Sequence, residues 1–195
     1  MVCCAQANII YLYIRKIPMK KLILILPLAL VLYVMVGCQD KEAIAELEEF
    51  RAQAELEEQN KELVHIAYEV WNKLDIEALK EIYSPDFVWY ISGGEAFALE
   101  DLIEDLKWEI TVYPDRTFTP EDLISKGNKV VSRYVLRGTH EGEREGQPPT
   151  GKKIKMEGIF ISRVENGKIM ETWEVADLLS VYKQLGFELK PKENN

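Results

Sequence analysis

Cysteine is almost absent from this 195-residue chain: Cys3, Cys4 and Cys38 are its three cysteines, and none follows residue 38. A disulfide framework and a cysteine-based zinc site each need several cysteines, so the C-terminal part of the chain has neither. Histidine is as scarce, with only His65 and His140. Two histidines so far apart do not form a metal-binding motif, and the sequence predicts a site without a metal.

Positive charge is also in short supply, with 24 basic against 33 acidic residues. Four of the basic residues and no acidic residue precede Cys38, so the remainder carries 20 − 33 = −13. Such a surface repels nucleic acid and anionic lipid. The sequence has no phosphate-binding loop, no Gly-x-Ser-x-Gly elbow and no dinucleotide fingerprint, which argues against nucleotide and hydrolase chemistry.

The chain has one long apolar run, residues 22–36, which follows Met19-Lys20-Lys21 and precedes Gly37-Cys38. A basic start, an uncharged core and a small residue before the cut are typical of a secretory signal. With the cysteine directly after Gly37, the stretch resembles a bacterial lipoprotein signal, in which that cysteine is lipidated and becomes the mature N-terminus. The alternative is an uncleaved anchor, although 15 residues are short for a span of about 20.

We therefore expect residues 1–37 to be a signal peptide and Cys38 to anchor the protein to the membrane, outside the cytoplasm, in the cell envelope. Residues 1–18 form a doubtful upstream extension, and the start codon, Met1 or Met19, stays open. Residues 38–61 are rich in helix formers and predict a helical spacer. Their apolar stripe (Ile44, Leu47, Phe50, Ala54) allows a short coiled coil instead, but it covers less than three heptads.

Residues 62–187 carry the pattern of one α+β domain, followed by a polar tail at 188–195. Apolar spacing predicts helices over 63–74, 76–83, 99–113 and 177–185 and strands over 86–91, 130–139, 153–164 and 168–175. Gly127-Asn128 and Asn166-Gly167 predict tight turns between strands. Residues 119–122 look locally like a helix start, but the turn after them demands a strand, which we favour.

Several segments together resemble the SnoaL-like polyketide cyclase (ester cyclase) family over about residues 62–187. They are Gly-Thr-His-Glu-Gly-Glu at 138–143, Gln-Pro-Pro-Thr-Gly-Lys at 147–152, Asn-Gly-Lys-Ile at 166–169, Glu171, Trp173, Asp177, Gln-Leu-Gly at 184–186, Tyr68, Trp71-Asn72 and Ser-Pro-Asp-Phe-Val at 84–88. The resemblance implies the cone-shaped α+β barrel of the nuclear transport factor 2-like superfamily, a curved antiparallel sheet wrapped around N-terminal helices. The cyclases close a ring by intramolecular aldol condensation without metal or cofactor. The superfamily also contains non-enzymatic binders, so the fold alone does not decide the function.

In the cyclases the acid–base carboxylate is an aspartate on the last strand, and ungapped alignment puts Glu174 at that position. The extra methylene moves the carboxylate, so the same substrate is not implied. Strand alternation places Met170, Thr172 and Glu174 on one face. The neighbouring strand places Ile154, Met156, Gly158 and Phe160 together on one face. An apolar lining with one carboxylate would raise its pKa, but an exposed charge at the strand end remains the alternative.

His140 is the second candidate catalytic residue. It is either a hydrogen-bond donor and proton partner in the pocket, or a strand-end residue that holds the loop 141–152. His65 is expected on the surface. Within the loop, Arg144 and Glu145 are expected to be solvated, and the Pro-Pro-Thr-Gly segment to stiffen the pocket rim.

Large apolar side chains are first of all core residues, but some of them would line a cavity in this fold. The candidates for ligand binding are Tyr68, Trp71, Trp89, Tyr90, Trp108, Tyr134, Met156, Phe160 and Met170. The family often carries a histidine at the position of Trp89-Tyr90, so this chain lacks one polar group that its relatives have. We favour a lipid-anchored binder of a small apolar ligand, because polyketide intermediates are made inside the cell. The alternatives are a cofactor-free cyclase or isomerase and a homodimer joined through Ile159 and Ile161.

Overall fold

The computed structural model describes the backbone of residues 19–187 and the side chains of residues 41–187. The upstream extension and the polar tail lie outside the described residues, and the apolar run and Cys38 lie outside the described side chains. The chain divides after Ala52 into two compact units, and the second unit contains every element discussed below apart from the start of the first helix. Among the residues that were described, no helix is both long and apolar enough to cross a membrane.

One helix, α2 (Met19–Lys73), replaces the two helices expected over 38–74. Its last turns bury Val64, Ala67, Tyr68 and Trp71, whose spacing of three and four residues places them on one face of the helix. The Asn72 side chain then accepts from the backbone N–H of Phe118 at 2.8 Å and donates to its carbonyl at 2.9 Å. This amide fixes the end of α2 to the first strand of the main hairpin.

The next elements are α3 (Ile76–Ile82), β1 (Tyr83–Tyr90), β2 (Ala96–Phe97) and α4 (Leu99–Val112). Asp75 caps α3 by accepting from Ala78 N at 3.1 Å. Strand β1 begins earlier than the predicted residue 86 and includes Pro85. Proline has no N–H to donate, and it lies where the pairing register between β1 and β6 shifts.

Four long strands complete the sheet: β3 (Thr117–Lys126), β4 (Lys129–Thr139), β5 (Lys153–Glu165) and β6 (Lys168–Ala176). The strand order is β2-β1-β6-β5-β4-β3, with β1 parallel to β6 and all other pairs antiparallel. The strand preferred over a helix at 119–122 is confirmed. Pro120 in this strand has no backbone N–H to donate, and it lies at a shift in register, where the regular pairing of the strands is interrupted. Both predicted tight turns are present, and Asn166 and Gly167 have the positive φ of 51° and 72° that such a turn requires.

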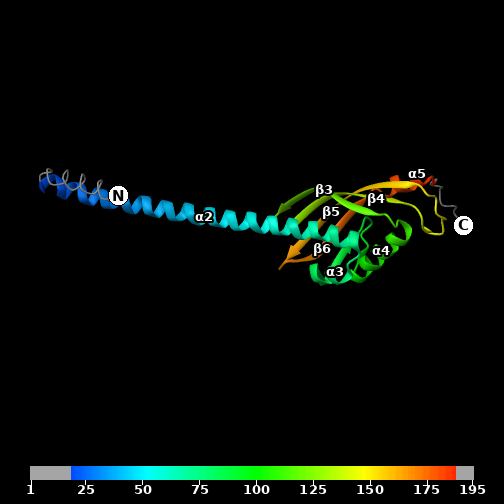
Figure 1. The fold of residues 1–195 in the computed structure, drawn as a ribbon. Helices are drawn as coiled ribbons and strands as arrows, with labels where there is room; N and C mark the ends of the chain where they lie inside the picture. Colours follow the sequence, from blue (N-terminus) through cyan, green and yellow to red (C-terminus); the bar gives the residue numbers. More distant parts are fainter. Residues whose placement is uncertain (1–18, 188–195) are drawn as a thin grey trace, which may run out of the picture. The chain divides into compact units, whose positions relative to one another are not determined.

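The six-stranded sheet is curved but not closed, and it arches over the end of α2 with α3 and α4 beside it (Figure 1). The predicted α+β class is therefore confirmed. On β5 the side chains of Ile154, Met156, Phe160 and Val164 are buried on the concave face, as alternation predicts.

The alternation predicted for β6 does not hold at its start. The register shift between Arg163 and Val164 leaves Met170 without a partner across from β5, so the faces exchange there. Ile169 is buried, whereas Met170, expected beside Thr172 and Glu174, is not in the core.

The last helix, α5 (Leu178–Leu185), packs its buried Val181 and Leu185 near β5. Asp177 caps it by accepting from Ser180 N at 3.0 Å, and Gly186 ends it with φ of 91°. The Gln184 amide exchanges hydrogen bonds with the backbone N and O of Lys155, both at 2.8 Å. These bonds hold α5 at the end of the sheet where the loop 141–152 returns.

Candidate functional site

Two adjoining cavities lie between the concave face of the sheet and α4. The inner one has a volume of about 40 Å³ and the outer one about 290 Å³. Both are lined by Trp89, Asp105, Glu109, Met156 and Glu174. The shared residues join the two spaces into one site whose outer part approaches the size of a small-molecule pocket.

Glu174 on β6 is held by two neutral donors. Trp89 donates its indole N–H to Oε2 at 3.0 Å, and the Tyr134 hydroxyl donates to Oε1 at 2.5 Å. Within the described side chains, no basic group forms an ion pair with Glu174. Burial raises the pKa of Glu174 to about 7, the two hydrogen bonds oppose this, and the nearby Asp105 adds to it. The carboxyl can therefore both take and return a proton near neutral pH.

A glycine makes room for the Tyr134 contact. Gly158 lies opposite Tyr134 in the β4–β5 ladder, and a Cβ there would stand 2.5 Å from the phenol oxygen. Phe160, two residues further along β5, stacks on the Tyr134 ring with centroids 4.5 Å apart. The glycine and the phenylalanine thus set the position from which the Tyr134 hydroxyl reaches Glu174.

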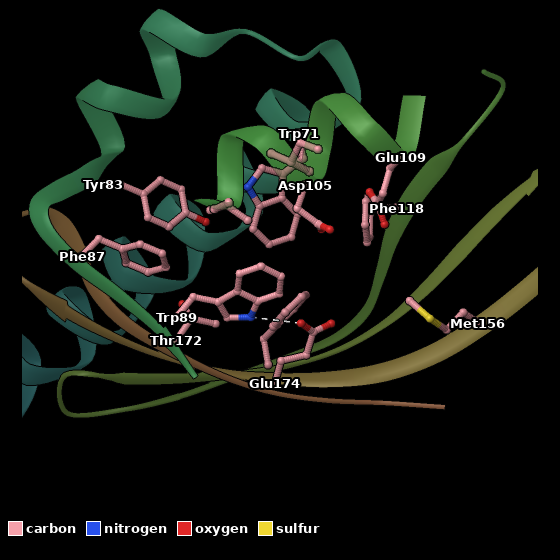
Figure 2. Close-up of a pocket in the computed structure, with 13 residues that line it drawn as sticks. Trp71, Tyr83, Phe87, Trp89, Asp105, Glu109, Phe118, Met156, Thr172 and Glu174 are labelled. Carbon is pink, nitrogen blue, oxygen red and sulfur yellow. Dashed lines mark hydrogen bonds between the residues drawn. The ribbon is translucent and has the colours of Figure 1, made fainter. Parts of the chain in front are cut away.

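Two further carboxyls face Glu174 from helix α4. Asp105 and Glu109 are four residues apart, share one helix face and point into the cavity from the wall opposite Glu174 (Figure 2). Burial raises the pKa of Asp105 to about 6 and that of Glu109 to about 8, and for Glu109 the neighbouring carboxyls add to the effect. Three buried carboxyls in one cavity disfavour one another's ionised forms, so they do not all ionise together at neutral pH.

The positive charge of Arg116 opposes the rise in the pKa of Glu109. Its Nε lies 3.6 Å from Glu109 Oε2, and its Nη2 donates to the carbonyl of Trp71 at 3.0 Å. Glu109 Oε2 is nevertheless buried without a hydrogen-bond partner in the part of the chain that is described.

Sequence reasoning missed both α4 carboxyls. A signal was available, because Glu109 interrupts the apolar stripe of Leu102, Leu106 and Tyr113 at helical spacing.

Of the nine residues predicted to bind ligand, five line the cavities: Trp71, Trp89, Trp108, Met156 and Phe160. The others lie elsewhere. Tyr68 donates to Ser132 Oγ at 2.8 Å within the core, Tyr90 stacks on Trp173 at 5.5 Å, and Tyr134 reaches the site only through its hydroxyl. Met170 lines neither cavity because of the register shift described above.

His140 is fully buried and does not line either cavity. Its Nδ1 accepts from Thr150 N at 3.3 Å, and its backbone pairs with Lys152 O and Gly151 N at 2.9 Å each. Burial lowers its pKa, with Arg144 adding to the effect. These contacts support the interpretation that His140 holds the loop 141–152, and they do not support a role as proton partner for Glu174. His65 is exposed, as expected.

The expectation that Arg144 is solvated is wrong. Its side chain is buried with the guanidinium centre 5.0 Å from the Trp108 ring and 5.3 Å from the Tyr182 ring, and it lines the outer cavity. The cause is a tight turn, in which Arg144 and Gln147 exchange backbone hydrogen bonds and fold the loop back over the two rings. Glu145 is exposed, as expected.

The fold and site define an α+β domain with a curved sheet and a carboxylate-bearing concave cavity. The family model of SnoaL-like polyketide cyclases matches residues 61–185, and the chain belongs to this family. The aklanonic acid methyl ester cyclase DnrD of Streptomyces peucetius is 30% identical over 97 residues, which cover 49% of this chain and 63% of the relative. The nogalonic acid methyl ester cyclase of Streptomyces nogalater is 28% identical over 96 residues, covering 49% and 68%.

Solved structures agree with this assignment. Wild-type IdmH from Streptomyces antibioticus is 33% identical with a TM-score of 0.62, covering 66% of this chain and 99% of IdmH. A SnoaL-like polyketide cyclase from Agrobacterium tumefaciens has a TM-score of 0.53 at 22% identity, with 63% and 95% covered, and supports the fold alone.

Proposed function

We propose that the domain is a cofactor-independent acid–base enzyme of the cyclase or isomerase type, with Glu174 as its base. The observation that carries the proposal is the placement of Glu174, which lies in a largely apolar cavity and is held by Trp89 and Tyr134 rather than by a cation. A base with a pKa near the working pH is the efficient one for abstracting a proton from carbon. The names of the related methyl ester cyclases support the same class of chemistry.

The arrangement supports a two-carboxyl mechanism. Ionised Glu174 takes a proton from the carbon beside a carbonyl, and the electron pair moves onto the carbonyl oxygen. Glu109, which burial keeps protonated, donates a hydrogen bond to that oxygen from the opposite wall. The enolate carbon then attacks a second carbonyl of the same molecule, and Glu174 returns its proton to the new alkoxide. An isomerase would instead return the proton to another carbon.

The two raised pKa values set the pH at which this mechanism runs. It needs Glu174 ionised and Glu109 protonated, and their pKa values are about 7 and about 8. The rate therefore rises through the first value and falls through the second, as a bell with its maximum between them.

Exchange of the carbon-bound protons of 2-tetralone for deuterium tests the proposal, because this small bicyclic ketone needs only the first step. NMR should show exchange faster than in buffer alone, with the bell-shaped pH profile. Exchange at the buffer rate, with the ketone bound, would reject the enzyme and leave the second candidate, a binder of small apolar ligands. The largely apolar lining of the outer cavity favours that candidate.

We further propose that Cys38 is lipidated and holds the domain at the cell envelope, as the sequence around Gly37 indicates. The net negative charge of the part after Cys38 supports attachment by acyl chains rather than by electrostatic attraction. Replacing Cys38 with serine should move the protein from the membrane fraction to the soluble fraction. Unchanged membrane association would reject lipidation.

A homodimer through the convex face of β5 and β6 is the remaining proposal. Ile159 and Val175 are cross-strand partners there and are 45% and 66% exposed, with Ile161 nearby at 37%. Ile159→Glu should convert a dimer to a monomer in sedimentation equilibrium. A monomeric wild-type protein would reject this proposal.

A further inference from the structure

Arg144 is a buried cation with few partners. Its residue is 6% exposed, yet the one hydrogen bond that its guanidinium makes among the described residues is to the neutral Tyr113 hydroxyl, at 3.3 Å. Its Nε is buried without a partner. A guanidinium carries five N–H donors, and enclosing it without an anion costs free energy that paired arginines recover.

Among the described side chains, no carboxylate forms a hydrogen bond with Arg144, although its charge lowers the pKa of Asp105 and Glu109 across the cavity. Glu145 approaches Nη2 only at 3.5 Å, its own side chain is 56% exposed, and both its oxygens accept from the Tyr182 hydroxyl. Asp105 and Glu109 line the same cavity, but no ion pair joins either to Arg144 within the described side chains. The aromatic rings of Trp108 and Tyr182 lie close to the guanidinium and attract it without neutralising its charge.

The position of Arg144 gives it access to a ligand. It forms part of the wall of the outer cavity, together with Trp89, Trp108 and Glu174. A ligand in this cavity therefore meets a fixed, underpaired cation and the proposed base in one enclosed space. The planar guanidinium matches a carboxylate in shape and charge.

We propose that the outer cavity takes a small ring compound that carries a free carboxylate, and that Arg144 binds this carboxylate. This inference rests on the proposed function, because it names the substrate class of the same site. The ring system packs against Trp89 and Trp108, and the carboxylate fixes which carbon lies beside Glu174. Two cyclases related to this chain are named for methyl esters, so a free acid would set this protein apart from them.

The raised pKa of Glu109 is compatible with an anionic ligand, because a protonated carboxyl does not repel it. Asp105, with its lower pKa of about 6, retains a negative charge at neutral pH. This charge favours a ligand with one negative charge over one with two.

Calorimetric titration with naphthalene-2-carboxylate and its methyl ester tests the proposal, because the pair shares one apolar body. The wild type should bind the acid at least about tenfold more tightly than the ester, as a charge-assisted hydrogen bond predicts. Arg144→Gln should lose that preference and still bind the ester. Arg137→Gln removes the same charge from an exposed position on β4 and should behave as the wild type.

The proposal is overturned if the wild type binds the ester as tightly as the acid, if Arg144→Gln keeps the preference, or if neither compound binds at about 1 mM. Arg144→Lys keeps the charge without the planar fork and should show an intermediate preference. If both variants fail to fold, the wild-type comparison decides alone. The 2-tetralone assay does not involve the carboxylate, so proton exchange there with no acid preference here would reject this inference and retain the proposed enzyme.

Discussion

Strand β6 carries two glutamates three residues apart, and they meet opposite environments. Glu171 accepts from the Arg163 side chain at 2.5 Å in a pair that is only partly buried. Glu174 faces the concave side, where Trp89 and Tyr134 donate to it and Asp105 lies nearby. The same residue type on the same strand is thus an ordinary ion-pair partner on one side and a carboxyl with a raised pKa on the other.

The comparison extends to the two faces of the sheet. On the convex face the charges are paired: Arg133 lies against Glu121 and Asp122, and Lys155 against Glu157. Partly solvated pairs of this kind cost little and contribute little. On the concave face the carboxyls outnumber their cations and lie among aromatic rings. Functional chemistry is expected where charges remain uncompensated.

The largest expected effect separates the two glutamates directly. Glu174→Gln removes the proposed base and should lower the rate of 2-tetralone exchange by about 10³-fold. Glu171→Gln is the matched change on the other face and should keep the rate within about twofold. NMR detection of deuterium incorporation measures both. Equal losses in the two variants would contradict the difference between the faces.

The pH dependence of stability should show the same asymmetry. The pKa of Glu174 is about 7 in the folded state, against 4.5 for an ordinary glutamate, so between these values the folded state binds a proton that the unfolded state does not. The contribution of Glu174 to the free energy of unfolding is therefore complete below pH 4.5. As the pH rises to 7, the protein loses roughly 3 kcal/mol of stability through this group alone. Urea unfolding at pH 5 and pH 8 should show this loss in the wild type and a smaller one in Glu174→Gln. A wild-type protein that gains stability over that range would contradict the account.

A smaller effect is expected from removing one donor to Glu174. The Tyr134 hydroxyl favours the ionised carboxylate, so Tyr134→Phe should raise the pKa of Glu174 further. The rising limb of the exchange profile should move upward by about one pH unit. Tyr90→Phe, which alters a ring stacked on Trp173, is the control and should leave the limb in place. A limb that moves downward in Tyr134→Phe would be inconsistent with this hydrogen bond.

The smallest effect is expected on the convex face. Arg163 pairs with both Glu165 and Glu171 through contacts of 2.9 and 2.5 Å. Because these groups are partly solvated, Arg163→Gln should lower the free energy of unfolding by less than about 1 kcal/mol and leave proton exchange unchanged. Denaturant titration together with the exchange assay checks both expectations. A loss of activity would show that the two faces are coupled.

Most of the fold could be predicted because its signals are local. The turns form at Asn166-Gly167 and at Gly127, where the residue types favour a positive φ. Asp75 and Asp177 cap the helices that follow them, and buried and exposed residues alternate regularly along β5. The β6 prediction failed at Met170 because a bulge arises from pairing between strands and leaves no mark in the alternation itself.

The candidate site was only partly predictable for the same reason. The position of Glu174 followed from the family pattern, but its donors come from distant strands. Arg144 looked solvated because a charged residue in a loop usually is, and only the folded loop brings it between Trp108 and Tyr182. Glu109 could have been found, since a carboxylate within an apolar helical stripe must be buried if that helix packs.

The pKa of Glu174 is the quantity on which the whole account depends. A carboxyl-resolved NMR titration of the wild type, assigned by comparison with Glu174→Gln, measures it directly. We expect a value of about 7. A value near 4.5, the pKa of an ordinary glutamate, would show that Glu174 is a hydrated carboxylate and would contradict its role as the base.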